Sequence, residues 1–189
     1  ATVTWALDLM DRQIAHLARL VDDLLDVERL VHGKIRFDKK PLDLVALVNQ
    51  SIETRKHDAV PARVSAMLPA EPVMVYGDAT RLTQVVDNLL ANATFSTGQS
   101  GAVRVHVRRE DGEAVVQVAD TGSGIDPDKL PHIFEPFVQG DPAHGGLGLG
   151  LTLVQQLVNE HDGTVTAESA GPGRGSAFTV RLPTFGESS

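Results

Sequence analysis

The sequence contains no cysteine among its 189 residues. Disulfide bonds and thiolate metal sites are therefore excluded, and the absence is compatible with a reducing compartment. Aromatic residues make up only 4% of the chain, so aliphatic side chains must fill most of a core. No apolar run approaches the roughly 18 residues that a membrane-spanning helix needs.

Positive charge is scarce as well. Lysine and arginine number 17 against 25 aspartates and glutamates, which gives a net charge of -8. No basic run offsets this balance locally, so we expect contact with neither nucleic acid nor a membrane. A hydrophobic content of 42% is nevertheless typical of a globular protein.

The first thirty residues carry apolar side chains at alternating spacings of three and four, which predicts a long helix over residues 1–33. The stripe consists of Leu7, Met10, Ile14, Leu17, Val21 and Leu24. A helix this apolar along one side is expected to pair with another helix or chain, although docking on its own domain remains the alternative. The chain starts at Ala1 without a methionine or a signal-peptide pattern, so we expect a piece of a longer protein.

The remaining pattern predicts a linker over residues 34–42, one domain over 43–185 and a disordered tail over 186–189. Asp43 and Asp78 are placed to cap two helices, and alternating valines flank a hairpin signal at Asp111 and Gly112. Further elements are expected as strands at about 64–68, 73–76, 164–169 and 176–182, a short helical piece near 127–133 and a helix at about 147–161. The fold class is α+β: a two-layer sandwich of a mixed, mostly antiparallel sheet with helices on one face.

A first glycine run, Asp-Thr-Gly-Ser-Gly at residues 120–124, follows a predicted strand. A carboxylate at Asp120 can accept a hydrogen bond from an exocyclic amine such as that of adenine. Gly122 and Gly124 would allow the backbone to approach a flat ring closely. An ordinary turn after a strand gives the same pattern, so this motif alone leaves both interpretations open.

A second glycine run precedes a predicted helix and comprises Gly145, Gly146, Leu147, Gly148, Leu149 and Gly150. Free amide groups and the positive end of the helix dipole favour an anion such as phosphate at this place. A flexible linker is the alternative, but so many glycines at a helix start are costly unless a ligand compensates for them.

Two asparagines, Asn88 and Asn92, lie four residues apart on the helix that Asp78 is predicted to cap. Their amides project from the same side of that helix. A side-chain carbonyl oxygen is a hard ligand that suits Mg²⁺. Solvated asparagines are common on helices, so the pair gains its weight from the neighbouring motifs.

These motifs follow one another in a specific order and spacing: asparagines at 88–93, the first glycine run, Phe-Glu-Pro-Phe at 134–137, the second glycine run and Gly-Ser-Ala-Phe at 175–178. Together they resemble the catalytic, ATP-binding domain of sensor histidine kinases, whose superfamily includes gyrase, the Hsp90 chaperones and the mismatch-repair ATPases. Residues 12–26 are similar to the second helix of that family's dimerisation and phosphotransfer hairpin.

The resemblance implies a Bergerat-type ATP-binding fold with ATP and Mg²⁺ as cofactors. It implies that Asp120 contacts adenine, that Asn92 holds the metal and that Asn88 takes part in catalysis. Nucleotide contacts are implied for Asn88, Asn92, Asp120, Gly122, Gly124, Ile125, Gly145, Gly146, Leu147, Gly148, Leu149 and Gly150. A response-regulator receiver domain, a homodimer through the hairpin of the parent protein and a cytoplasmic location, with a parent that could be membrane-anchored, are also implied.

The chain departs from the family pattern in two respects. The acceptor histidine lies on the first hairpin helix of such kinases, and no such histidine box is present; His16 lies on the segment that matches the second helix. At Phe95 the family usually has a lysine or arginine that touches phosphate, and no lysine or arginine stands between Phe137 and Leu151. Compensating cations from elsewhere would be Arg104, Arg108 or Lys129.

Related ATPases carry a glutamate one helical turn before the metal asparagine, where this chain has Asn88. An amide is a poor general base, so phosphoryl transfer to a histidine on a separate helix is favoured over hydrolysis. The first hypothesis is thus a histidine kinase catalytic domain. The alternatives are a degenerate nucleotide-binding module, a dimerisation scaffold and, more weakly, a serine kinase of the anti-sigma-factor type.

Overall fold

The computed structural model describes residues 25, 36–56, 63–98, 101–139 and 147–186 of the chain. The helix predicted over residues 1–33 therefore lies outside the described residues, with the exception of Leu25, which is helical. Residues 187–189 of the predicted tail also lie outside them. Within these ranges, no helix is both long and apolar enough to cross a membrane.

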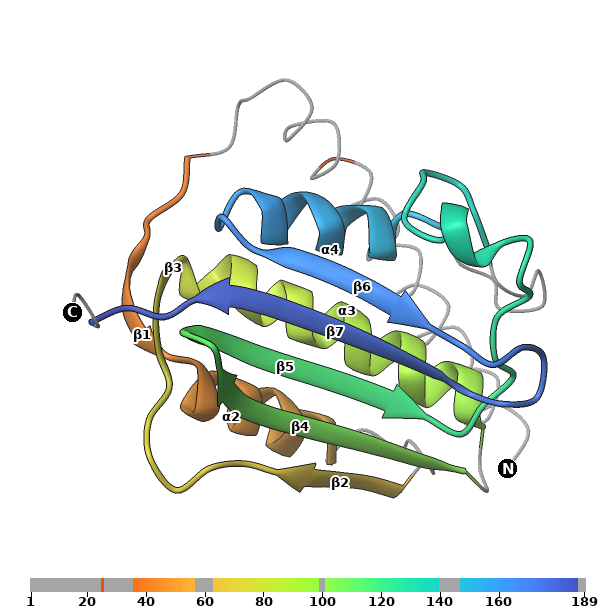
Figure 1. Cartoon of the computed structure of the whole chain (residues 1–189), viewed down its shortest axis with the longest axis horizontal. Coiled ribbons are helices and arrows are strands. Elements are labelled where there is room, and N and C mark those ends of the chain that lie inside the picture. Colours follow the sequence, from red (N-terminus) through yellow and green to blue (C-terminus); the bar gives the residue numbers. More distant parts are fainter. Residues whose placement is uncertain (1–24, 26–35, 57–62, 99–100, 140–146, 187–189) are drawn as a thin grey trace, which may run out of the picture.

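A five-stranded sheet forms one layer of the domain (Figure 1). Its order is β2 (Arg63–Met67), β4 (Ala102–Glu110), β5 (Glu113–Asp120), β7 (Ser176–Pro183) and β6 (Thr164–Glu168). Strand β2 pairs with β4 in parallel, and the other three pairs are antiparallel. The prediction of a mixed, mostly antiparallel sheet is therefore confirmed.

The central hairpin of β4 and β5 follows directly from the sequence. Val103, Val105 and Val107 alternate along β4, and all three are buried on the face that meets the helices. Asp111 and Gly112 connect the strands with φ angles of 52° and 79°. Positive φ at both central residues is typical of the two-residue turn whose twist matches the paired strands.

Three helices, α2 (Leu44–Lys56), α3 (Ala79–Thr97) and α4 (Gly150–Asn159), cover one face of the sheet (Figure 1). The predicted apolar face of α3 is buried throughout and comprises Leu82, Val85, Val86, Leu89 and Leu90. Phe178 of β7 lies in the same core with no exposed surface. The two-layer α+β sandwich is thus confirmed.

Aspartates begin two of these helices, as predicted. Asp78 Oδ1 accepts hydrogen bonds from the backbone N–H groups of Thr80 (3.0 Å) and Arg81 (3.2 Å) at the start of α3. Asp43 Oδ1 accepts from the N–H of Val45 at 2.9 Å and from that of Val73 at 3.2 Å. The second bond ties the start of α2 to the residue directly before strand β3 (Met74–Gly77).

The structure differs from the sequence prediction at several boundaries. Part of the expected linker forms β1 (Lys40–Asp43), which pairs antiparallel with β3 (Met74–Gly77) in a separate two-stranded sheet. The helix predicted from about residue 147 begins only at Gly150, because Gly148 has a φ of 69°, outside helical geometry. The expected helical piece near residues 127–133 is one 3₁₀ turn, η1 (Leu130–His132).

Truncation of the core side of α3 is expected to lower stability strongly. Leu89 is fully buried, so Leu89→Ala removes apolar contacts and leaves a cavity, which should cost about 2–5 kcal/mol. Met67→Ala is the control, since Met67 is 68% exposed and should change the free energy of unfolding by less than about 0.5 kcal/mol. Chemical denaturation measures both values, and similar costs for the two variants would contradict this description of the core.

Candidate nucleotide-binding site

Asp120 is the last residue of β5, and its carboxylate faces the helix layer. It lies opposite Val103 and Ser176 in the strand register and is only 7% exposed. Its Oδ1 accepts the N–H of Gly122 at 2.7 Å, and its Oδ2 accepts the hydroxyl of Ser176. Each carboxylate oxygen has two lone pairs, so the oriented group can still accept a hydrogen bond from a ligand amine.

The first glycine run is held against the end of α3 and against the loop between β6 and β7. The N–H of Ser123 donates to the carbonyl of Ser96 at 3.0 Å, and the N–H of Gly175 donates to the carbonyl of Gly122 at 3.2 Å. A Cβ on Gly122 would lie 2.2 Å from the Ser96 oxygen. Only glycine permits this close approach, so the run is a packed loop and not a solvent-exposed turn.

The loop continues into Gly124 and Ile125, which are also fixed by backbone contacts. Gly124 has a φ of 67°, and a Cβ there would lie 2.2 Å from the Gly171 oxygen. Ile125 is buried, and its N–H donates to Ser169 Oγ at 3.0 Å. Ser169 Oγ donates in turn to the carbonyl of Gly175 at 2.7 Å. The return loop of the sheet therefore stabilises the conformation of the first glycine run.

One face of α3 connects the two glycine runs. Asn88, Asn92 and Ser96 follow one another at intervals of four, which spans about 12 Å along the helix axis. Ser96 contacts the first run, and at the other end a Cβ on Gly150 would lie 3.9 Å from Cγ of Asn88. The structure therefore brings Asp120, the two asparagines and the start of α4 to one elongated site.

The second glycine run leads directly into α4. Gly145 and Gly146 lie outside the described residues, whereas Leu147 is 39% exposed and Leu149 is buried at the N-cap. A Cβ on Gly148 would lie 2.7 Å from the carbonyl oxygen of Val138. The first turn of a helix leaves N–H groups without intrahelical acceptors, so the start of α4 offers donors to an anion.

A buried polar atom points to a ligand at this end of the site. Asn88 Nδ2 is buried and has no hydrogen-bond partner among the described residues. On α4, Thr152 Oγ1 and Gln156 Oε1 are also buried and have no hydrogen-bond partner among the described residues. Leaving such atoms unpaired costs free energy, so a bound water or ligand is expected to satisfy them. A donor at Asn88 suits an anionic group.

The phenylalanine motif, residues 134–137, lies between the two glycine runs in the sequence, and its first ring packs against the core. Phe134 meets Phe178 edge to face, with ring centroids 6.3 Å apart. Phe137 is 67% exposed and has a φ of 66°, and its N–H donates to the carbonyl of Gly148 at 3.2 Å. The motif thus anchors residues on both sides of 140–146.

Of the three cations that could compensate for the missing ones, two lie on the far face of the sheet. Arg104 is exposed on the sheet face opposite the helices, and Arg108 pairs with Glu110 at 3.0 Å on that same face. Both therefore lie across the sheet from Asp120. Lys129 Nζ instead donates to the carbonyl of Gln139 at 3.2 Å, at the base of the segment before α4. Phe95, at the position where the family has a cation, is 57% exposed.

Residue patterns alone assigned no role to three serines of this site. Ser96, Ser169 and Ser176 hold the first glycine run and the carboxylate of Asp120. Their roles depend on strand register and on where α3 ends, which local patterns do not specify. The sequence signal for Ser176 is its place in the Gly-Ser-Ala-Phe motif at 175–178, which indicates the family but not the contact with Asp120.

The family model for the histidine kinase-, DNA gyrase B-, and HSP90-like ATPases matches residues 77–185, which include every described element of this site. The chain belongs to this family. Over 182 residues it is 37% identical to the sensor histidine kinase ZraS of Klebsiella oxytoca. That alignment covers 95% of this chain and 38% of ZraS.

Solved structures agree with this assignment. The mycobacterial sensor histidine kinase MprB is 31% identical, with a TM-score of 0.65 over 77% of this chain and 97% of the MprB chain. Full-length ShkA in complex with AMPPNP is 29% identical, with a TM-score of 0.78 over 100% of this chain and 40% of ShkA. Within the family, the chain is therefore the catalytic, ATP-binding domain of the sensor histidine kinase type. This domain and its N-terminal extension span about two fifths of the length of ZraS or ShkA.

The close contact at Gly122 predicts a sharp difference between two glycines of the ATP-binding domain. Gly122→Ala would force a methyl group against the Ser96 carbonyl and should cost roughly 1–3 kcal/mol of stability. In Gly150→Ala the nearest atom lies 3.9 Å away, and the better helix former should add up to about 1 kcal/mol. Urea unfolding compares them; equal effects would show that the first run is not packed as described.

Proposed function

We propose that this chain binds ATP with magnesium and transfers the γ-phosphoryl group to a histidine on a separate helix, for relay to the receiver domain of a response regulator. One face of α3 gives the main support, because it places Asn88 and Asn92 between a loop that can bind a base and a helix start that can bind phosphate.

The adenine end is assigned to Asp120 and the first glycine run. A buried carboxylate held by Gly122 and Ser176 is oriented before a ligand arrives, which reduces the ordering cost of binding. It accepts from the exocyclic amine of adenine and offers no donor to a base that carries a carbonyl there. Gly122, Gly124 and Ile125 complete this end of the site.

The triphosphate end is assigned to the second glycine run and to Asn88. Backbone N–H groups at residues 145–150 and the start of α4 donate to phosphate oxygens. The unpaired Nδ2 of Asn88 supplies a further donor beside Gly150. Because the second run contains no lysine or arginine, these neutral donors provide most of the protein's contribution there.

Magnesium is assigned to the side-chain oxygen of Asn92, which is half-buried on the same face. The described residues contain no group of three or more histidine, cysteine or acidic side chains that could form a metal cage. One amide oxygen together with phosphate oxygens and water suits Mg²⁺. When bound, the ion supplies positive charge to the transferring phosphoryl group.

Transfer is favoured over hydrolysis because the residue one turn before Asn92 is an amide. Asn88 can hold and orient but cannot remove a proton from water at neutral pH. The acceptor is then a histidine presented from outside this chain, and the predicted helix over 1–33 contributes to a homodimer of the parent protein. We place this reaction in the cytoplasm, where ATP is supplied.

The assignment of Asp120 to adenine predicts a loss of base discrimination. In the unaltered chain, ATP should bind at least ten times more tightly than a purine nucleoside triphosphate that lacks the exocyclic amine, because a hydrogen bond to a charged acceptor contributes about 1.5–3 kcal/mol. In Asp120→Ala this ratio should approach one. Titration calorimetry with Mg²⁺ present measures both affinities.

The ratio of the two affinities distinguishes a loss of adenine recognition from a general weakening of the loop. Asp120 also orients Gly122, so the variant could weaken the loop as a whole. Such damage would weaken both nucleotides equally and leave the ratio unchanged. An unchanged ratio in a folded Asp120→Ala chain would therefore contradict the adenine assignment.

Phosphoryl transfer is tested with a separate helical hairpin that carries an acceptor histidine. With ATP and Mg²⁺, the unaltered chain should label that hairpin. Asn92→Ala should reduce the rate at least about 100-fold, because it removes the proposed metal ligand and with it charge stabilisation of the transferring phosphoryl group. Asn49→Ala is the matched control, because Asn49 is exposed on α2. Binding of ATP without labelling would instead indicate the alternative, a nucleotide-binding module without transfer.

A further inference from the structure

Three consecutive residues attach the start of the domain to the start of α3 and to the end of α4. We call Phe37, Asp38 and Lys39 the lead-in segment. The Phe37 ring meets the His161 ring at 89° with centroids 5.6 Å apart, and the N–H of Asp38 donates to Asp78 Oδ2 at 2.9 Å. Lys39 Nζ donates to the carbonyl of Glu160, directly after α4.

His161 lies at the centre of these contacts and uses both ring nitrogens. It is 3% exposed; its Nε2 accepts the N–H of Asp78 at 3.0 Å, and its Nδ1 lies 2.7 Å from the carbonyl of Leu157. A carbonyl only accepts, so the Nδ1 carries the proton, and Nε2 is unprotonated because it faces an N–H. The geometry therefore requires a neutral imidazole of one tautomer.

Asp78 links the histidine to the other partners. The same residue that donates to His161 caps α3 and accepts the N–H of Asp38. Burial alone would raise the pKa of the Asp78 carboxyl, but the N–H groups of Asp38, Arg81 and Thr80 outweigh burial and lower the pKa below 3.8. The carboxylate thus stays charged where His161 would titrate.

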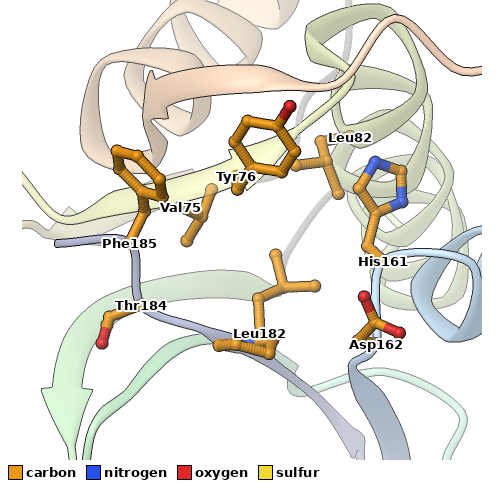
Figure 2. A pocket seen from close by; sticks show the side chains of 9 residues that line it. Val75, Tyr76, Leu82, His161, Asp162, Leu182, Thr184 and Phe185 are labelled. Carbon is orange, nitrogen blue, oxygen red and sulfur yellow. The ribbon is translucent and has the colours of Figure 1, made fainter. Parts of the chain in front are cut away.

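The His161 ring is closely packed on the side of Gly77 and Leu82. A Cβ on Gly77 would lie 2.9 Å from Cδ2 of His161 and 2.6 Å from Cδ1 of Leu82. On another side, His161 lines a small pocket together with Tyr76, Asp162 and Leu182 (Figure 2).

We propose that His161 is a proton-sensitive latch. While neutral, it holds the lead-in segment on the start of α3 and the end of α4, and it releases this segment when protonated. A second ring proton would point the Nε2–H at the N–H of Asp78, so the bond that joins α4 to the cap of α3 would be lost. Because both helices also carry the proposed nucleotide residues, the latch connects the chain that precedes the domain to that site.

The charges around the ring agree with a neutral imidazole. Burial is the largest influence and lowers the pKa of His161 below 6.5, and the nearby charge of Lys39 lowers it further. The Leu157 carbonyl and the carboxylates of Asp78 and Asp162 oppose this but do not outweigh burial. A histidine whose pKa is lowered on folding stabilises the fold above pH 6.5, and this contribution is lost as the pH falls below that value.

Hydrogen exchange of the whole 189-residue chain without nucleotide tests the latch. Opening exposes a histidine with an ordinary pKa of 6.5, so the protection of the Asp38 and Asp78 amides, corrected for intrinsic exchange, should fall by up to about fourfold from pH 8.0 to pH 6.0. In His161→Gln the dependence should disappear, because a glutamine oxygen can accept from Asp78 but does not titrate. His106→Gln, on the sheet face opposite the helices, should retain it.

Protection that is constant across this pH range in the unaltered chain, or that falls equally in His161→Gln, would overturn the proposal. Should His161→Gln fail to fold, the ¹⁵N shifts of the His161 ring decide: titration together with the loss of Asp38 protection supports the latch, and a protonated Nε2 at pH 8.0 contradicts it. The consequence for phosphoryl transfer rests on the proposed function. The exchange experiment needs no nucleotide, so its failure would leave the kinase assignment standing.

Discussion

The packing of α3 beneath the sheet determines how the two glycine runs and the two asparagines lie relative to one another. Its apolar side, which includes Leu82 and Leu89, is buried against β4, β5 and the other helices. This burial fixes the rotation of the helix, so Asn88 and Asn92 lie together on the side that flanks the apolar face. The two ends are fixed as well, by Asp78 at the start and by the contacts of Ser96 with the first glycine run.

The sheet register supplies the second half of the site. Asp120, Val103 and Ser176 are cross-strand neighbours, so the carboxylate is buried on the helix side with its hydroxyl partner already in place. A shift of one residue would turn Asp120 to the opposite face, with Arg104. The valines of β4 therefore support the proposed nucleotide site indirectly, because their burial prevents that shift.

Short local patterns in the sequence predicted most of the fold. The caps at Asp43 and Asp78, the Asp111 and Gly112 turn and the buried face of α3 all depend on local chemistry, and all are found. Strand β1 was missed because a four-residue strand with a proline has little local signal; it forms through pairing with β3. The start of α4 was misplaced because the left-handed Gly148 interrupts an otherwise helical pattern.

The site was predictable as a set of motifs but not as a geometry. Spacing placed Asn88 and Asn92 on one side of a helix, whereas the contacts of Gly122 with Ser96 and of Asp120 with Ser176 depend on tertiary packing. The role of His161 was not predictable, because a buried histidine with two backbone partners looks like any other histidine in a sequence. Its partners come from residues 4 and 83 positions away.

A crystal structure of this chain with a non-hydrolysable ATP analogue and Mg²⁺ would show whether α3 aligns one nucleotide between the two glycine runs. We expect the adenine amine within hydrogen-bond distance of Asp120, the metal on the Asn92 oxygen and the phosphates at the start of α4. A nucleotide bound in the reverse direction along α3, or away from that face, would contradict this expectation.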